Sequence, residues 1–159
     1  MDREHHFSED EFLSSVLPFA GALVQATSSI NIGVGIALAP FYDPIRLAED
    51  TATLDVLSRG RFHLGLGAGY RTEEFRGFAV PKEGRHARMV ELTEILNRAL
   101  SQKRFSFDGE FYQYDDLRVT PSPYTTPRPA IYYGGVAEAA VERAGEHSEG
   151  WIASQLHPK

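Results

Sequence analysis

The chain has 159 residues, 42% of them hydrophobic and 24% charged, which is typical of one globular domain with its own core. Sixteen basic against 22 acidic residues give a net charge of −6, which argues against a nucleic-acid-binding surface. The absence of cysteine excludes disulfides and thiolate metal sites. The longest apolar run, 32–39, is too short to span a bilayer, and the amino terminus has no signal-peptide core. We therefore expect a cytoplasmic protein that does not enter a membrane.

The first third of the chain is predicted to begin with strand and helix in alternation. Residues 4–7 are predicted to be the end of a strand and residues 17–27 a short helix. Residues 30–39 are almost wholly apolar, as is typical of a strand buried on both faces of a parallel sheet. Asp43 and Pro44 then start a helix, because aspartate can accept hydrogen bonds from the first amides and proline suits the first helical position.

The segment after this helix is unusually rich in glycine. Gly60 is predicted to end the helix in the left-handed conformation, and residues 61–67 to form the next strand. Gly65, Gly67 and Gly69 remove side chains from the end of that strand, so that another group can approach the backbone closely. Their G-x-G-x-G spacing departs from the dinucleotide-binding fingerprint. On the pattern alone, relief of crowding inside a barrel explains them best.

In the second half of the chain, strands and helices are again predicted to alternate, interrupted by one hairpin. Residues 105–114 place Asp108-Gly109 between two aromatic, alternating arms, which predicts a tight hairpin followed by a proline-rich loop. The other predicted elements are a helix at 83–100, a strand at 130–133 ending in Gly134-Gly135, a helix at 137–147 and a strand from 150 to 154. About five strands alternating with helices indicate an α/β fold with parallel strands and no internal repeat.

Several motifs, taken in order, resemble the bacterial luciferase-like flavin-dependent monooxygenases, a family of (β/α)8 barrels. They are EHHF at 4–7, INIGVGIALAPFYDP at 30–44, LSRGRFHLGLGAGY at 57–70, FDGEFY at 107–112, RPAIYYGG at 128–135 and EGW at 149–151. Each motif is weak by itself, but the series is consistent over nearly the whole chain. The resemblance implies a TIM barrel.

A complete barrel of this kind takes about 250 residues. Against the family, the chain matches strands 2–6 with an inserted β-hairpin, so that residues 1–159 form one luciferase-like domain, incomplete at both ends. An open parallel sheet would leave two unpaired edges and uncovered apolar surface. We therefore expect the isolated polypeptide to associate or to be poorly stable.

The resemblance implies a cofactor site at the carboxyl ends of the strands. The family's flavin phosphate is held at the position of Gly134 and Gly135, where the amides of Val136 and Ala137 also face a helix start. Without the resemblance, a plain βα turn that needs glycine is the better explanation of this pair; with it, phosphate binding is favoured. At Gly35-Ile36 the family often has a non-proline cis peptide or a bulge behind the flavin ring, although an ordinary strand glycine fits the sequence as well.

Two further positions follow from the same resemblance. Ala68 and Gly69 match a place used for ring or phosphate contacts, where several relatives carry an arginine. Arg71, Arg85 or Arg88 could replace its charge, although isolated arginines are commonly surface residues. His5 matches the catalytic histidine of the luciferases, and an imidazole can serve as base or acid near neutral pH. Adjacent strand residues point to opposite faces, so His5 and His6 are not expected to share a metal.

The implied activity is that of a flavin-dependent oxidoreductase using FMN or coenzyme F420. We expect monooxygenation of a small organic substrate with reduced flavin and oxygen, a flavin reductase as supplier, and a homo-oligomer in the full-length form. F420-dependent hydride transfer stays open, and so does a non-catalytic flavin-binding protein or inactive barrel fragment. A third alternative is a (β/α) enzyme that binds a phosphorylated metabolite without flavin.

Overall fold

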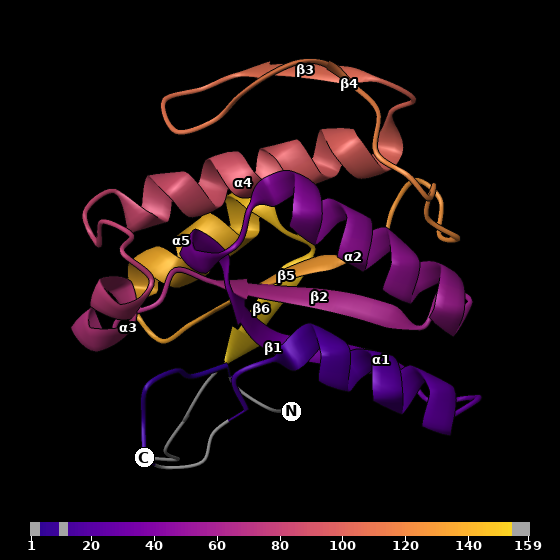
Figure 1. Ribbon diagram of the computed structural model, residues 1–159, viewed down its shortest axis with the longest axis horizontal. Helices are drawn as coiled ribbons and strands as arrows, with labels where there is room; N and C mark the ends of the chain where they lie inside the picture. Colours follow the sequence, from indigo (N-terminus) through magenta and orange to yellow (C-terminus); the bar gives the residue numbers. More distant parts are fainter. Residues whose placement is uncertain (1–3, 10–12, 154–159) are drawn as a thin grey trace.

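The centre of the protein is a parallel four-stranded sheet with the strand order β1-β2-β5-β6 (Figure 1). The computed structural model describes residues 4–9 and 13–153. The strands of the sheet are Ile32–Leu38 (β1), Phe62–Gly67 (β2), Ile131–Gly135 (β5) and Gly150–Ala153 (β6). Parallel strands joined by helical crossovers confirm the predicted α/β fold, with four strands in this sheet rather than about five.

Helices connect the strands and pack on the sheet. They are α1 (Val16–Ala26), α2 (Pro44–Ser58), α3 (Thr72–Gly77), α4 (Arg85–Ser101) and α5 (Glu138–His147), with a 3-10 turn at Ala39–Phe41. Neighbouring helices touch in the order α1, α2, α4, α5, which follows the order of the strands beneath them. The core lies between these helices and the sheet, where Leu47, Leu64 and Leu92 are fully buried. No helix in the described ranges is long and apolar enough to cross a membrane.

The start of α2 forms as its sequence predicts. Asp43 Oδ1 accepts hydrogen bonds of 2.9 Å from the amides of both Ile45 and Arg46. These bonds satisfy donors that a helix start otherwise leaves unpaired. At the other end the left-handed conformation begins one residue earlier than predicted, at Arg59 (φ 57°), and continues at Gly60 (φ 82°).

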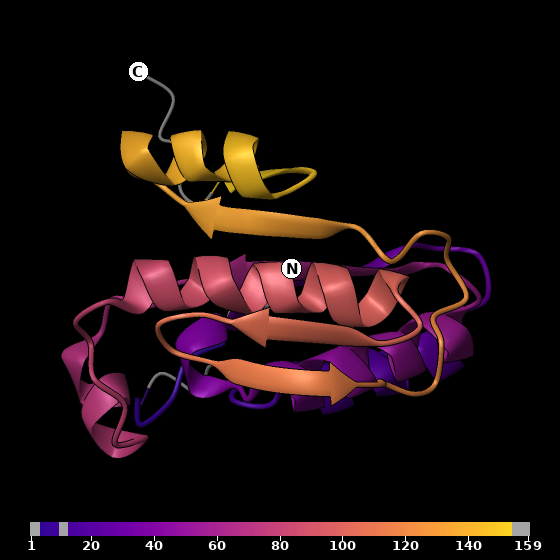
Figure 2. The same cartoon turned by 90° about the horizontal axis from the view of Figure 1, so that it is seen from above.

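The predicted hairpin is present, but its turn is longer than expected. β3 (Phe105–Asp108) pairs with β4 (Gln113–Leu117), and the pair runs alongside α4 (Figure 2). The turn spans residues 109–112 instead of closing at Asp108-Gly109. A contact from another element explains the difference. The carboxylate of Glu91 on α4 accepts the amides of residues 110, 111 and 112 at 2.7, 3.0 and 3.3 Å.

One local prediction is wrong, and one helix was not predicted. Residues 4–7 are not a strand; Glu4 donates one backbone hydrogen bond to Ile36, and Phe7 turns the chain away with a φ of 54°. Helix α3 was not predicted, since its single apolar core residue, Phe75, gives no periodic signal. The strand predicted for 150–154 is confirmed through Ala153, and Ser154 lies outside the described residues.

Candidate functional site

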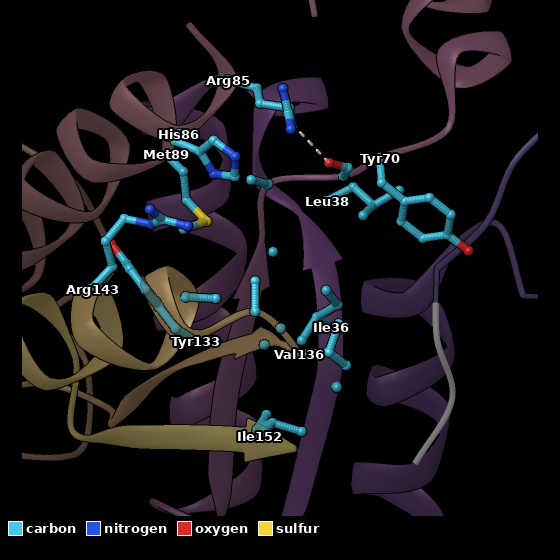
Figure 3. A pocket seen from close by; sticks show the side chains of 18 of the residues that line it. Ile36, Leu38, Tyr70, Arg85, His86, Met89, Tyr133, Val136, Arg143 and Ile152 are labelled. Atoms are coloured by element: carbon cyan, nitrogen blue, oxygen red, sulfur yellow. Dashed lines mark hydrogen bonds between the residues drawn. The ribbon is translucent and has the colours of Figure 1, made fainter. Parts of the chain in front are cut away.

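A cavity of about 610 Å³ opens at the carboxyl ends of the four parallel strands (Figure 3). This edge is where parallel α/β sheets bind ligands. The cavity brings together all nine residues proposed from the sequence: His5, Gly35, Ile36, Ala68, Gly69, Gly134, Gly135, Val136 and Ala137. The structure thus places them at one site, although they come from four separate stretches of the chain.

The floor of the cavity is built around Ile36. The peptide bond between Gly35 and Ile36 is cis, and the β1–β2 register shifts beside it. The Ile36 side chain reaches over the neighbouring strands. A Cβ atom on Gly67 would lie 1.9 Å from its Cδ1 atom, and a Cβ atom on Gly134 would lie 2.6 Å from its Cγ2 atom. Glycine at these positions therefore makes room for Ile36. This finding supports the explanation of Gly67 as a relief of crowding.

The turn between β5 and α5 forms one wall. Gly134 and Gly135 end the strand, and Val136 is 69% exposed before the helix begins. The indole nitrogen of Trp151, on β6, donates a 2.8 Å hydrogen bond to the Gly135 carbonyl and fixes the end of β5. Trp151 therefore has a structural role in this wall. The amides that follow Gly135 lie at the positive end of α5, which favours an anion.

Three basic side chains stand beside this turn. Arg85 and His86 begin α4 and Arg143 comes from α5, and all three line the cavity (Figure 3). Burial and the nearby charges of Arg143 and Arg85 lower the pKa of His86. Nδ1 of His86 and Nε of Arg143 are buried and have no hydrogen-bond partner among the described residues. Buried polar atoms are normally paired, so these two atoms indicate a missing anionic or polar partner.

The arginines considered as substitutes at Ala68 and Gly69 have different surroundings. Arg85 donates from Nε to the Gly69 carbonyl at 3.2 Å and lines the cavity beside it. Arg88 is instead stacked on Phe111, 4.5 Å from the ring centre. Arg71 is not among the residues lining the cavity. Of the three arginines, Arg85 is therefore the one whose position fits the replacement of the arginine that several relatives carry at Ala68 or Gly69.

His5 lies at the end of the cavity away from the basic cluster, beside Tyr70. Its Nδ1 is 3.0 Å from Oε1 of Glu74, a carboxylate that is fully buried on α3. The Tyr70 ring meets the His5 ring edge-on at a centroid distance of 6.0 Å. His6 points elsewhere, against Phe78, and does not line the cavity. The two histidines have different surroundings, although residues 4–7 do not form the strand from which their divergence was predicted.

Glu4 borders the same end of the cavity and is 2% exposed. Burial raises the pKa of Glu4, although hydrogen bonds from the Tyr42 hydroxyl (2.6 Å) and the Leu38 amide act to lower it. Burial and the adjacent Glu4 raise the pKa of Tyr42 in turn. The cavity therefore has a cationic end at α4 and α5 and a carboxylate–histidine end at residues 4–5.

Sequence reasoning missed several lining and supporting residues: Glu4, Glu74, His86, Met89, Tyr133 and Arg143. Most lie on helices and read as ordinary helical residues. Glu4 and Tyr133 lie outside the helices, directly before the predicted residues His5 and Gly134, and the Tyr133 hydroxyl forms a 2.7 Å hydrogen bond with Thr93. Proximity to predicted site residues was the signal that could have found these two.

Sequence comparison gives a consistent family match. The model of the family described as luciferase-like monooxygenase matches residues 3–159. The alkanal monooxygenase beta chain of Photorhabdus laumondii is 33% identical over 143 residues, which are 90% of this chain and 44% of that protein. The chain spans about half the length of the curated relatives it matches.

Solved structures show the same arrangement of elements. Monooxygenase RslO1 from Streptomyces bottropensis superposes with a TM-score of 0.88 at 26% identity, over 98% of this chain and 48% of that one. Two others are similar in fold alone. They are the oxygenating component of 3,6-diketocamphane monooxygenase from Pseudomonas putida, in complex with FMN (TM-score 0.85, 19% identity), and an F420-dependent secondary alcohol dehydrogenase (TM-score 0.81, 22% identity). This chain covers 47% of the former and 46% of the latter.

Proposed function

Because this chain belongs to the luciferase-like monooxygenase family, we propose that it forms part of a flavin-dependent oxidoreductase that oxygenates a small organic substrate. FMN is the cofactor we favour, and its phosphate would lie between the β5–α5 turn and the basic cluster of Arg85, His86 and Arg143. The observation that carries this proposal is that cluster, with its two unpartnered buried nitrogen atoms beside a helix start.

The residues present fit a phosphorylated flavin. A phosphate group accepts several hydrogen bonds, and Arg143, His86 and the amides after Gly135 offer donors on the same side of the cavity. A phosphomonoester carries close to two negative charges at neutral pH, which suits a site with two arginines. The volume of about 610 Å³ lies within the range of small-molecule sites.

When bound, the flavin would supply electron transfer and oxygen activation. The chain's own residues would anchor the phosphate at the cationic end and give the ring an apolar surface at Ile36, Met89 and Ala68. His5, at the opposite end, would accept or donate the proton that the reaction moves. A flavin reductase as supplier and a homo-oligomeric full-length form belong to the same proposal.

The test is equilibrium binding followed by turnover. The purified chain is titrated with FMN and with F420 while flavin absorbance and fluorescence are followed, and NAD(P)H or F420 oxidation is then measured. We expect saturable FMN binding and a turnover above the uncatalysed rate that His5→Ala removes. His6→Ala is the matched control, because His6 is adjacent in sequence but does not line the cavity.

Other results of the binding and turnover experiment would favour one of the alternative functions. Preferential F420 binding without oxygen consumption supports hydride transfer, and the F420-dependent fold relative makes this the second candidate. FMN binding without turnover indicates a flavin-binding protein or a barrel fragment without catalysis. Binding of inorganic phosphate with no affinity for either flavin would contradict the proposed cofactor and favour a phosphorylated metabolite.

A further inference from the structure

Glu74 is a fully buried carboxylate with an unequal set of partners. Its Oε1 atom accepts the backbone amide of His6 at 3.0 Å and lies 3.0 Å from Nδ1 of His5. Its Oε2 atom is buried without a hydrogen-bond partner in the described part of the chain. A buried carboxylate normally needs full hydrogen bonding or an opposite charge, and this one has neither while His5 is neutral.

The pairing fixes the proton arrangement of the His5 ring. A carboxylate can only accept hydrogen bonds, so the contact with Glu74 requires a hydrogen on Nδ1 of His5. The neutral ring then carries its lone pair on Nε2. The hydrogen on Nδ1 points to the Glu74 carboxylate, so Nε2 is the ring atom that can exchange a proton with a ligand.

The same chain segment holds the ring on a second side. Tyr70 stands at the strand end just before α3 and meets the His5 ring edge-on at an interplanar angle of 85°. Helix α3 then places Glu74 behind the ring, where it also holds the backbone of the next residue through His6 N. Residues 70–74 therefore contact the His5 ring on two sides, and Glu74 binds its Nδ1 atom.

From this geometry we propose that Glu74 is the positioning residue of His5. It selects the Nδ1–H form of the neutral imidazole, so that proton exchange with a substrate or cofactor takes place at Nε2. The proton moves between the ligand and Nε2 while Nδ1 keeps its hydrogen, as in other histidine–carboxylate pairs. This inference rests on the proposed role of His5 in the reaction.

If Glu74 had a purely structural role, a different result would be expected. Glu74 would then only anchor the loop through the His6 amide, and the hydrogen position on His5 would not depend on it. The two roles separate in the tautomer of His5, which long-range nitrogen–proton NMR correlations of ¹⁵N-labelled protein report directly. The experiment needs no flavin and no activity.

We expect the neutral His5 ring of the unmodified chain to carry its hydrogen on Nδ1. Glu74→Gln retains an acceptor oxygen of the same size and is expected to keep that tautomer. Glu74→Leu removes the acceptor, and the hydrogen is expected to move to Nε2 in most molecules. Asp55→Asn is the matched control, because Asp55 is an equally buried carboxylate that binds Thr125 instead.

Two results would overturn the inference. One is an Nε2–H tautomer in the unmodified chain, a result that stands even when Glu74→Leu does not fold. The other is a folded Glu74→Leu variant whose His5 keeps Nδ1–H. Failure of the proposed function looks different, since absent flavin binding would leave the Nδ1–H tautomer unchanged.

Discussion

The Cδ1 atom of Ile36 lies 1.9 Å from the position that a Cβ atom on Gly67 would occupy. No side chain fits there while Ile36 keeps its rotamer, so the two residues are packed as a pair across β1 and β2. Ile36 also covers Gly134, where the corresponding distance to its Cγ2 atom is 2.6 Å. The side chain of Ile36 therefore packs against glycines of two strands at the floor of the cavity.

Gly67→Ala is expected to lower the free energy of unfolding by about 1–3 kcal/mol, because the new methyl group overpacks the site. Ile36→Val removes the Cδ1 atom that it meets and is expected to recover part of this loss in the double variant. Urea unfolding of the two single variants and the double variant measures the coupling.

Gly65 provides the contrast, since its Cβ would lie 2.3 Å from the Val34 carbonyl oxygen, which is backbone. Gly65→Ala should therefore not be rescued by Ile36→Val. Gly145→Ala is the neutral control in α5, where a Cβ meets nothing within 4 Å. Additive effects of Gly67→Ala and Ile36→Val would contradict the paired packing.

Glu149 should stabilise the protein in a pH-dependent manner. Burial acts to raise its pKa, but hydrogen bonds from Arg128 and the Ile131 amide outweigh it, so the pKa of Glu149 lies below its ordinary value. Its contribution is present above the ordinary pKa of 4.5 and is lost as the pH falls through the lowered value. Glu149→Gln should cost about 1 kcal/mol or less near neutral pH, since the group is partly exposed, and less in acid.

Glu4 should show the opposite trend. Burial raises its pKa above the ordinary 4.5, so the folded state favours the protonated carboxyl, and stability falls as the pH rises from 4.5 through the raised value. Glu4→Gln removes this term and should therefore gain stability relative to the unmodified chain as the pH rises. Urea unfolding from pH ~4 to ~8 compares both variants. Parallel curves for Glu4→Gln and the unmodified chain would show that Glu4 titrates as an exposed group.

The hairpin should depend on one carboxylate of α4. Glu91 accepts three amides of the turn at residues 110–112, and truncation to alanine leaves them without that acceptor. We expect Glu91→Ala to destabilise the protein by about 1–3 kcal/mol and to speed amide hydrogen exchange in the turn. Glu94→Ala is the control, because Glu94 is half exposed and pairs only with Arg98 of its own helix. An unchanged rate of amide hydrogen exchange in the turn of Glu91→Ala would mean that the turn does not depend on Glu91.

Local signals in the sequence were enough for most of the fold. Asp43 and Pro44 specify the start of α2 by themselves, because capping involves residues only two and three positions away. The turn at 109–112 could not be predicted in the same way, since its amides bind Glu91 about 20 positions earlier in the chain. Similarly, α3 has only six residues and no periodic apolar face.

The residues of the candidate site also fall into those that the sequence could predict and those that it could not. Gly134, Gly135 and Ile36 were found through the family resemblance. It left a cis peptide or bulge at Gly35-Ile36 open against an ordinary strand glycine, and the structure contains the cis peptide. His86 and Arg143 were missed because they lie on different helices, 57 positions apart, and meet only in the folded chain. Glu74 was missed for the same reason, since its role depends on a contact 69 residues away.

The basic cluster of Arg85, His86 and Arg143 is proposed to hold the phosphate of a flavin. The most direct test compares the affinities of FMN and riboflavin, which differ only in that phosphate, for the unmodified chain and for an Arg85→Met/Arg143→Met variant. Arg98→Met is the control, since Arg98 faces the hairpin. We predict that FMN binds at least about tenfold more tightly than riboflavin, about 1.4 kcal/mol, and that the double variant loses this preference. Equal affinities for the two flavins in the unmodified chain would contradict the claim.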